Sequence, residues 1–126
     1  MASVLVDDFF NEVEKVASGD HSDIAKFRFA HAETIIPFAA ELKLEGSTLG
    51  VARDTLYSQS DNPWRGSWVA PYSANIQWDV YRDSANGTLV TMYYNEKQIK
   101  FMADCVPYEK SAYYYQLDEL KRCYNR

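Results

Sequence analysis

Histidine and cysteine are scarce in this chain, with two of each among 126 residues. A structural zinc site needs about four such ligands at short, characteristic spacings. His21, His31, Cys105 and Cys123 do not stand at those spacings. The sequence therefore argues against a small metal-binding protein, and neither a metal nor another cofactor is expected.

Basic clusters are also lacking. The chain has 13 Lys and Arg against 18 Asp and Glu, a formal net charge of −5, and no stretch rich in Lys or Arg. Proteins bind nucleic acids through concentrated positive charge, so a nucleic-acid partner is not expected. A polyanionic substrate would need the few cations gathered in one pocket. Arg28 is the candidate cation, and the rest of such a pocket would come from outside this chain.

Long apolar runs are missing too. No run approaches the roughly 20 residues that cross a bilayer, so membrane insertion is not expected. No signal peptide is visible at the start, because Asp7 and Asp8 follow the first few apolar residues. A secreted enzyme of which this chain is a part would carry its signal upstream, so this absence says little about the compartment.

Apolar residues are plentiful, at 47% hydrophobic and 15% aromatic, which is enough for a core. Residues 1–126 are expected to form a single domain or a fragment of one. Periodicity and turn residues predict the following elements in chain order. They are a helix at 3–18, a buried strand at 25–30, a helix at 32–43, a long loop at 45–70 with a helical turn at 48–57, a hairpin of 76–81 and 89–94, a short strand at 98–102 and a helix at 115–124.

This order predicts an α/β fold, with a mixed sheet and flanking helices. The strand at 25–30 would lie parallel to strands outside this chain and would leave an exposed edge if the chain is alone. Pro37, inside the second helix, should kink or loosen its first turns. Asn86-Gly87-Thr88 fits a glycosylation sequon. It fits a hairpin turn equally well, and the turn is the safer interpretation.

The most informative stretch is residues 26–38, Lys-Phe-Arg-Phe-Ala-His-Ala-Glu-Thr-Ile-Ile-Pro-Phe. It places His31 and Glu33 where a helical pattern begins. A carboxyl group beside an imidazole at a helix N-terminus can bind an anion and move a proton. The ordinary alternative is a first-turn Glu that interacts favourably with the helix dipole.

The whole run resembles the second active-site motif of the histidine acid phosphatases. The His-Ala-Glu version is similar to that of the multiple inositol polyphosphate phosphatase branch. Residues 69–76 and 90–97, and the end of the chain from Cys105 to Cys123, also resemble the family. Together these parts extend over roughly residues 24–124, which implies the C-terminal portion of a histidine phosphatase-type catalytic domain.

The resemblance implies roles for Glu33 and His31, and the residues around them suggest roles for Arg28 and Thr34. Glu33 would be the proton donor to the leaving alkoxide, and His31 would donate a hydrogen bond to a phosphoryl oxygen. Arg28 would be either a cation of the substrate pocket or a plain salt-bridge partner. Thr34, with the backbone N–H groups of residues 32–34, could bind phosphate, although capping by local groups is the commoner arrangement.

The nucleophile of the family lies in an Arg-His-Gly-x-Arg motif, which this sequence lacks. His21 has no arginine beside it and reads as a solvated loop residue. Two hypotheses remain. The chain is the proton-donor part of a phosphomonoesterase acting on a phosphorylated small molecule, such as an inositol polyphosphate, with the nucleophile in an upstream half. Alternatively it is a non-catalytic remnant that binds or associates.

Cys105 and Cys123 could be reduced thiols of a cytosolic protein or a disulfide pair. A bridge there would stabilise the fold by very roughly 3 kcal/mol in the chain-entropy model. The family resemblance favours the bridge. A bridge in turn implies an oxidising compartment, so the protein is expected to be secreted or in the endomembrane lumen.

Overall fold

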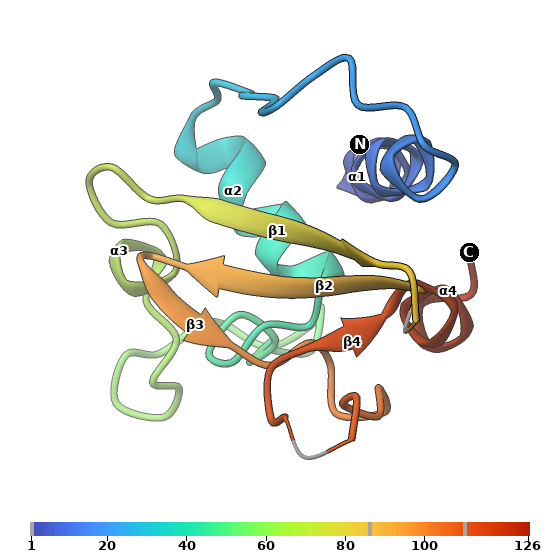
Figure 1. Cartoon of the computed structure of the whole chain (residues 1–126). Coiled ribbons are helices and arrows are strands. Elements are labelled where there is room, and N and C mark those ends of the chain that lie inside the picture. The colour runs from blue at the N-terminus through green and yellow to red at the C-terminus, as the bar shows by residue number, and fades with distance from the viewer. Residues whose placement is uncertain (1, 86, 110) are drawn as a thin grey trace.

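The structure is a computed structural model that describes residues 2–85, 87–109 and 111–126. In these residues the protein consists of a four-stranded antiparallel sheet and four helices (Figure 1). The helices are α1 (Ala2–Ala17), α2 (Ala32–Glu41), α3 (Gly66–Val69) and α4 (Leu117–Tyr124). The strands are β1 (Ile76–Asp83), β2 (Gly87–Tyr94), β3 (Lys97–Ile99) and β4 (Tyr115–Gln116). The α/β class predicted from the sequence is confirmed.

The sheet is built on the predicted hairpin. β1 and β2 pair in register from Ile76↔Tyr94 to Asp83↔Gly87. β3 pairs with one end of β2, and β4 pairs with the other, through Leu89↔Gln116 and Val90↔Tyr115. Asn86, the residue at which the turn and the sequon compete, lies outside the described residues.

One prediction was wrong: residues 25–30 are not a strand. They form an extended connection between α1 and α2, seen as the blue trace at the top of Figure 1. This segment was expected to supply the parallel pairing of a mixed sheet. Without it, every pair among the described strands is antiparallel. The alternating apolar pattern was real, but no strand within the described part of the chain lies beside it.

Two smaller predictions also need correction. The helical turn expected at 48–57 is absent, and the long loop instead contains α3. Arg65 orders that loop, because its guanidinium donates to the Tyr57 hydroxyl and to the carbonyls of Gln59 and Asn62. The final helix begins at Leu117, and the two residues before it pair with β2 instead.

The core lies between α1, α2 and one face of the sheet, and the partly buried Trp78 of β1 packs against it. The Trp78 ring contacts Phe9 and Phe10 of α1, with centroids 5.3 Å away in both cases, and Phe101 at 5.1 Å. Phe9 in turn contacts Phe38 of α2 at 5.0 Å. Aromatic pairs at such distances add to the free energy gained by burying their area. This contact set fixes where α2 begins relative to α1.

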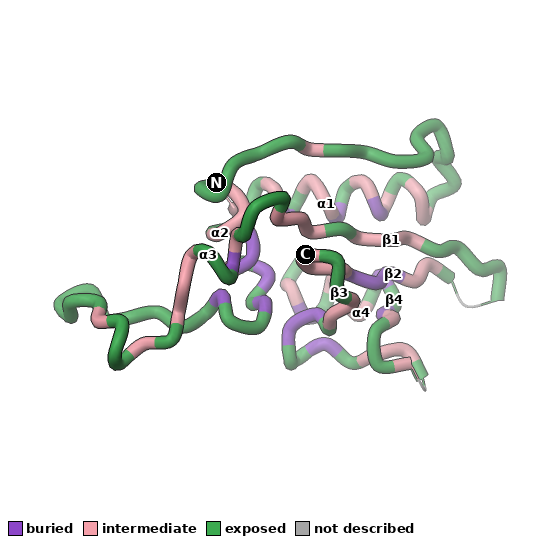
Figure 2. The backbone as a smooth tube through the Cα atoms, turned by 90° about the vertical axis from the view of Figure 1, so that its left-hand side faces the viewer, coloured by how far each residue is buried: buried purple, intermediate pink, exposed green. Residues whose placement is uncertain are grey.

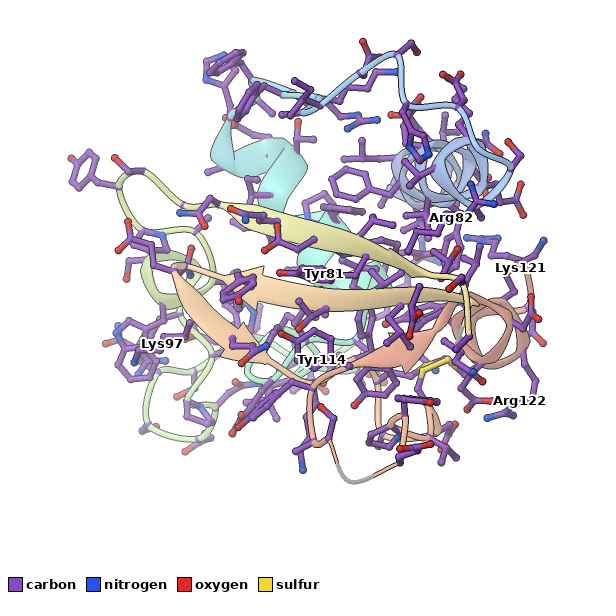
Figure 3. The ribbon with its side chains drawn as sticks, viewed as in Figure 1. Tyr81, Arg82, Lys97, Tyr114, Lys121 and Arg122 are labelled. Carbon is purple, nitrogen blue, oxygen red and sulfur yellow. A yellow bond between two sulfur atoms is a disulfide. The ribbon has the colours of Figure 1, made fainter. Side chains whose placement is uncertain are left out.

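The opposite face of the sheet carries polar and tyrosine side chains. Gln77 donates to Asp79, and the rings of Tyr81 and Tyr114 lie 5.8 Å apart. Figure 3 shows these two rings side by side on the face turned to the viewer. One face is therefore buried and the other is half-exposed, as in most antiparallel sheets.

The last helix is tied to the rest by a disulfide between Cys105 and Cys123, whose Cα atoms are 5.4 Å apart, and the bridge predicted from the resemblance is present. Glu119 adds a second tie, since it accepts from the backbone N–H of Val106 at 2.7 Å and from Arg122. Those bonds lower the pKa of Glu119 to about 2, and the bond from Arg122 contributes most to the shift. No helix in the described ranges is long and apolar enough to cross a membrane.

Candidate active site

The candidate site begins with the segment that leads into α2. The chain leaves α1 at Gly19, whose φ of +97° suits glycine, and turns back along the outside of α1. Figure 2 shows the segment before α2 as an almost wholly exposed strip that runs beside α1. The segment ends at His31, where α2 starts.

Two ion pairs hold this segment against α1. Lys26 Nζ lies 2.5 Å from Glu12 Oε1, and Arg28 Nε lies 2.5 Å from Asp8 Oδ2. Glu12 also accepts from Lys15 at 2.8 Å, and the bonds from Lys15 and then Lys26 lower the pKa of Glu12 to about 2. The path of the segment is thus set by the acidic side of α1.

His31 is the N-cap of α2, with φ −109° and ψ 174°, and its side chain does not cap the helix. Its carbonyl accepts from the N–H groups of Thr34 at 2.9 Å and Ile35 at 3.1 Å. Within the described residues, the N–H groups of Ala32 and Glu33 have no partner. Two donors at the positive end of α2 therefore face solvent.

Glu33 is in the first turn of α2 and is exposed, as is His31. Neither side chain has a hydrogen bond or ion pair to another described residue. Pro37 lies inside α2, which continues past it to Glu41. Because Pro37 has no N–H, the Glu33 carbonyl lacks its usual helical donor. The predicted pair is therefore at one solvated helix start, two residues apart.

Arg28 is committed to Asp8, the salt-bridge arrangement that was one of its two sequence interpretations. Its guanidinium also stacks over the Phe9 ring, with Cζ 4.7 Å from the centroid. Thr34 is half-buried, and its backbone N–H is capped by the His31 carbonyl. Roles for Arg28 and Thr34 in substrate binding stay predictions.

Asp8 and Glu12 are the residues that sequence reasoning missed. They stand four apart in α1, so they share one face of that helix. That spacing was visible in the sequence, but what they bind depended on where the following segment runs. His21, in contrast, is exposed as expected. No group of three or more metal-ligating side chains occurs among the residues that the structure describes.

The fold and the site thus define the class of protein: an α/β unit in which the sequence His-Ala-Glu stands at a solvated helix start. Solved structures of the same class match the chain closely. The structure of Bifidobacterium longum multiple inositol polyphosphate phosphatase in complex with inositol hexasulfate is 43% identical to the chain, with a TM-score of 0.84, and the match covers 97% of this chain and 24% of that one. Its complex with phosphate is 42% identical with a TM-score of 0.85, covering 97% of this chain and 26% of that chain.

The apo form of that enzyme matches equally, with 42% identity, a TM-score of 0.83 and coverage of 97% and 26%. This chain therefore spans about a quarter of the length of these solved structures. No protein-family model matches the chain, and no curated protein matches it. The likeness extends over nearly the whole of this chain.

Proposed function

We propose that this chain supplies the proton-donor part of a phosphatase that hydrolyses phosphate monoesters, with inositol polyphosphates as the substrate class. The observation that carries the proposal is the match to a multiple inositol polyphosphate phosphatase over 97% of the chain at 43% identity. The helix start described above supports it, because free N–H groups and the positive end of a helix dipole favour an anionic group there.

In this proposal Glu33 protonates the oxygen of the leaving alcohol as the P–O bond breaks. His31 donates a hydrogen bond to a phosphoryl oxygen and stabilises the charge that develops in the transition state. The phosphoryl group passes to a nucleophilic histidine carried by an upstream portion, and water then releases phosphate. The roles of Glu33 and His31 follow from the family resemblance, and their exposure leaves them accessible to a substrate.

The Cys105–Cys123 disulfide favours an oxidising compartment, so we place the protein in the secretory pathway or outside the cell. The second candidate function is non-catalytic association. It is favoured by the solvated state of His31 and Glu33, which have no partner among the described side chains.

The test is a chimera in which this chain replaces the matching quarter of the B. longum enzyme. Glu33→Gln should cut hydrolysis of inositol hexakisphosphate about 10²–10⁴-fold, because an alkoxide needs a proton to leave. The loss of activity of the same variant towards an activated phenyl phosphate should be much smaller. His31→Ala should slow both substrates alike, since it removes charge stabilisation from both transition states.

Glu41→Gln, at the exposed end of the same helix, is the matched control and should leave both rates unchanged. Equal losses for the two leaving groups in Glu33→Gln would make Glu33 a positioning residue. A folded chimera without activity would support the non-catalytic alternative.

A further inference from the structure

Two tyrosine rings meet on the half-exposed face of the sheet. The rings of Tyr81 and Tyr114 have centroids 5.8 Å apart and are tilted by 57° to one another (Figure 3). We propose that this pair is an oxidative modification site, at which a haem peroxidase with hydrogen peroxide joins the two rings as dityrosine. The proposal is independent of the proposed function, because it needs no phosphorylated substrate and no residue outside this chain.

The register of the sheet explains why these two residues meet. Tyr81 of β1 pairs with Leu89 of β2. β4 pairs with the opposite edge of β2, and the register of that pairing, extended by one residue, places Tyr114 beside Thr91. Leu89 and Thr91 project from the same face of β2, so both tyrosines do as well. The two rings therefore meet across β2.

The backbone holds both rings in place. Tyr81 is part of the β1–β2 ladder. The Tyr114 N–H donates to Ser111 Oγ at 3.2 Å, and the Tyr114 carbonyl accepts from the Tyr108 N–H at 2.7 Å. Partial desolvation raises the pKa of Tyr81, and Asp79 and the neighbouring Tyr114 raise it further. Tyr81 is therefore a neutral phenol at neutral pH, and its oxidation releases a proton together with an electron.

The coupling needs one oxidant and gives one other product. Each tyrosine gives up one electron and one proton, and hydrogen peroxide takes up both pairs to form two molecules of water. The haem of the peroxidase carries the electrons one at a time. The two tyrosyl radicals form a bond between ring carbons next to the hydroxyl-bearing carbons, and the hydrogens on the bonded carbons move to the two oxygens. Radicals held in contact couple with each other before they meet another molecule.

The usual targets of oxidants are shielded in the described part of the chain. Thiols and thioethers are such targets, but both cysteines are in the disulfide, and Met92 and Met102 are 0% and 7% exposed. Tyr81 is 47% exposed, so an oxidant can withdraw an electron there. No other two tyrosine rings are in contact among the described residues. One pair of phenols is thus both accessible and in contact.

The cross-link would fasten a weakly held part of the fold. β4 pairs with β2 through only two residues, and the connection from β3 to β4 has no helix or strand in its described part. The disulfide holds this connection at Cys105, and dityrosine would hold it at Tyr114. A covalent cross-link constrains the unfolded chain, so the modified protein should be more stable.

Treatment of purified residues 1–126 with a haem peroxidase and one equivalent of hydrogen peroxide tests the proposal. The product should be a monomer lighter by two hydrogen atoms, with the blue fluorescence of dityrosine, and peptide mapping should find Tyr81 joined to Tyr114. It should unfold at a higher urea concentration than the untreated protein. Tyr81→Phe and Tyr114→Phe keep the rings but remove one phenol. Each should lower the fluorescence of the monomer at least about tenfold, because no second radical is in contact.

Tyr113→Phe is the matched control, since Tyr113 adjoins Tyr114, is 38% exposed and has no ring contact among the described residues. It should leave the fluorescence unchanged. The proposal is overturned if the monomer keeps its mass, if its fluorescence survives in Tyr114→Phe, or if only the exposed Trp68 is oxidised. Dityrosine found only in dimers would also overturn it, because exposed rings such as Tyr72 would then be coupling between molecules.

Discussion

Tyr124 joins three separate parts of the chain at the level of a single residue. Its hydroxyl donates to the buried Leu42 carbonyl just after α2, at 2.9 Å, and accepts from the Met102 N–H at 3.4 Å. Its ring contacts Phe10 of α1 at 5.9 Å and Phe101 at 6.3 Å. Burial raises the pKa of Tyr124 to about 12.

We predict that Tyr124→Phe destabilises the protein by about 1–3 kcal/mol, because it leaves the Leu42 carbonyl buried without a donor. The loss should be measured by urea denaturation at neutral pH. Tyr72→Phe is the control, since Tyr72 is fully exposed, and it should have no effect. An unchanged midpoint in Tyr124→Phe would mean that water replaces the hydroxyl.

Tyr124 also determines the direction in which the free energy of unfolding changes with pH. The folded state favours the neutral phenol, so its contribution is fully present below the ordinary pKa of 10 and is lost as pH rises toward about 12. Burial also raises the pKa of Tyr94 and Tyr115. The free energy of unfolding should therefore fall between about pH 10 and pH 12. Tyr124→Phe should remove only part of that fall.

At the scale of elements, α4 shows why a short helix needs external ties. It has eight residues, and an isolated helix of that length is not stable in water. Leu117 and Leu120 bury its apolar face, and the disulfide from Cys123 to Cys105 fixes its end. Figure 3 shows the bridge beside α4, near Arg122.

Replacement of both cysteines by alanine should destabilise the protein by about 3 kcal/mol, because the unfolded chain loses its cross-link. The free energy of unfolding, measured in urea for the oxidised wild type and the double variant, gives the difference. Wild type unfolded in the presence of a reductant is the matched control and should resemble the variant. Equal stability of oxidised and reduced wild type would contradict the prediction.

At the scale of the whole molecule, the candidate site is solvated and one-sided. His31 and Glu33 stand at an exposed helix start, and Arg28, the candidate cation of the sequence, is bound to Asp8. A phosphatase of the proposed kind needs a nucleophile and cations around the phosphate. Among the described residues, no such group lies against His31 or Glu33.

We therefore expect no phosphatase turnover from residues 1–126 alone. Covalent catalysis needs its nucleophile, and His21, the only other histidine, is an exposed residue in the connection after α1. Purified protein should release no phosphate from a chromogenic ester at acid pH. The prediction fails if turnover persists through purification and disappears in His21→Ala.

The sequence alone determined the elements whose causes are local. The helical spacing of residues 3–18 and the two alternating runs about the turn at 83–87 predicted α1 and the β1–β2 hairpin, and both are present. The helix start at His31 was predicted from the same kind of signal. Each depends on residues a few positions apart, so each can be read along the chain.

Tertiary structure decided what depends on distant partners. Residues 25–30 have the alternation of a strand, but a strand exists only where another one pairs with it, and none does here. Residues 115–116 lie in a predicted helix, yet they pair with β2 because α4 packs at that end of the sheet. The ion pairs of Lys26 and Arg28 likewise depend on the direction of α1. Packing between distant segments, which no local pattern encodes, made these choices.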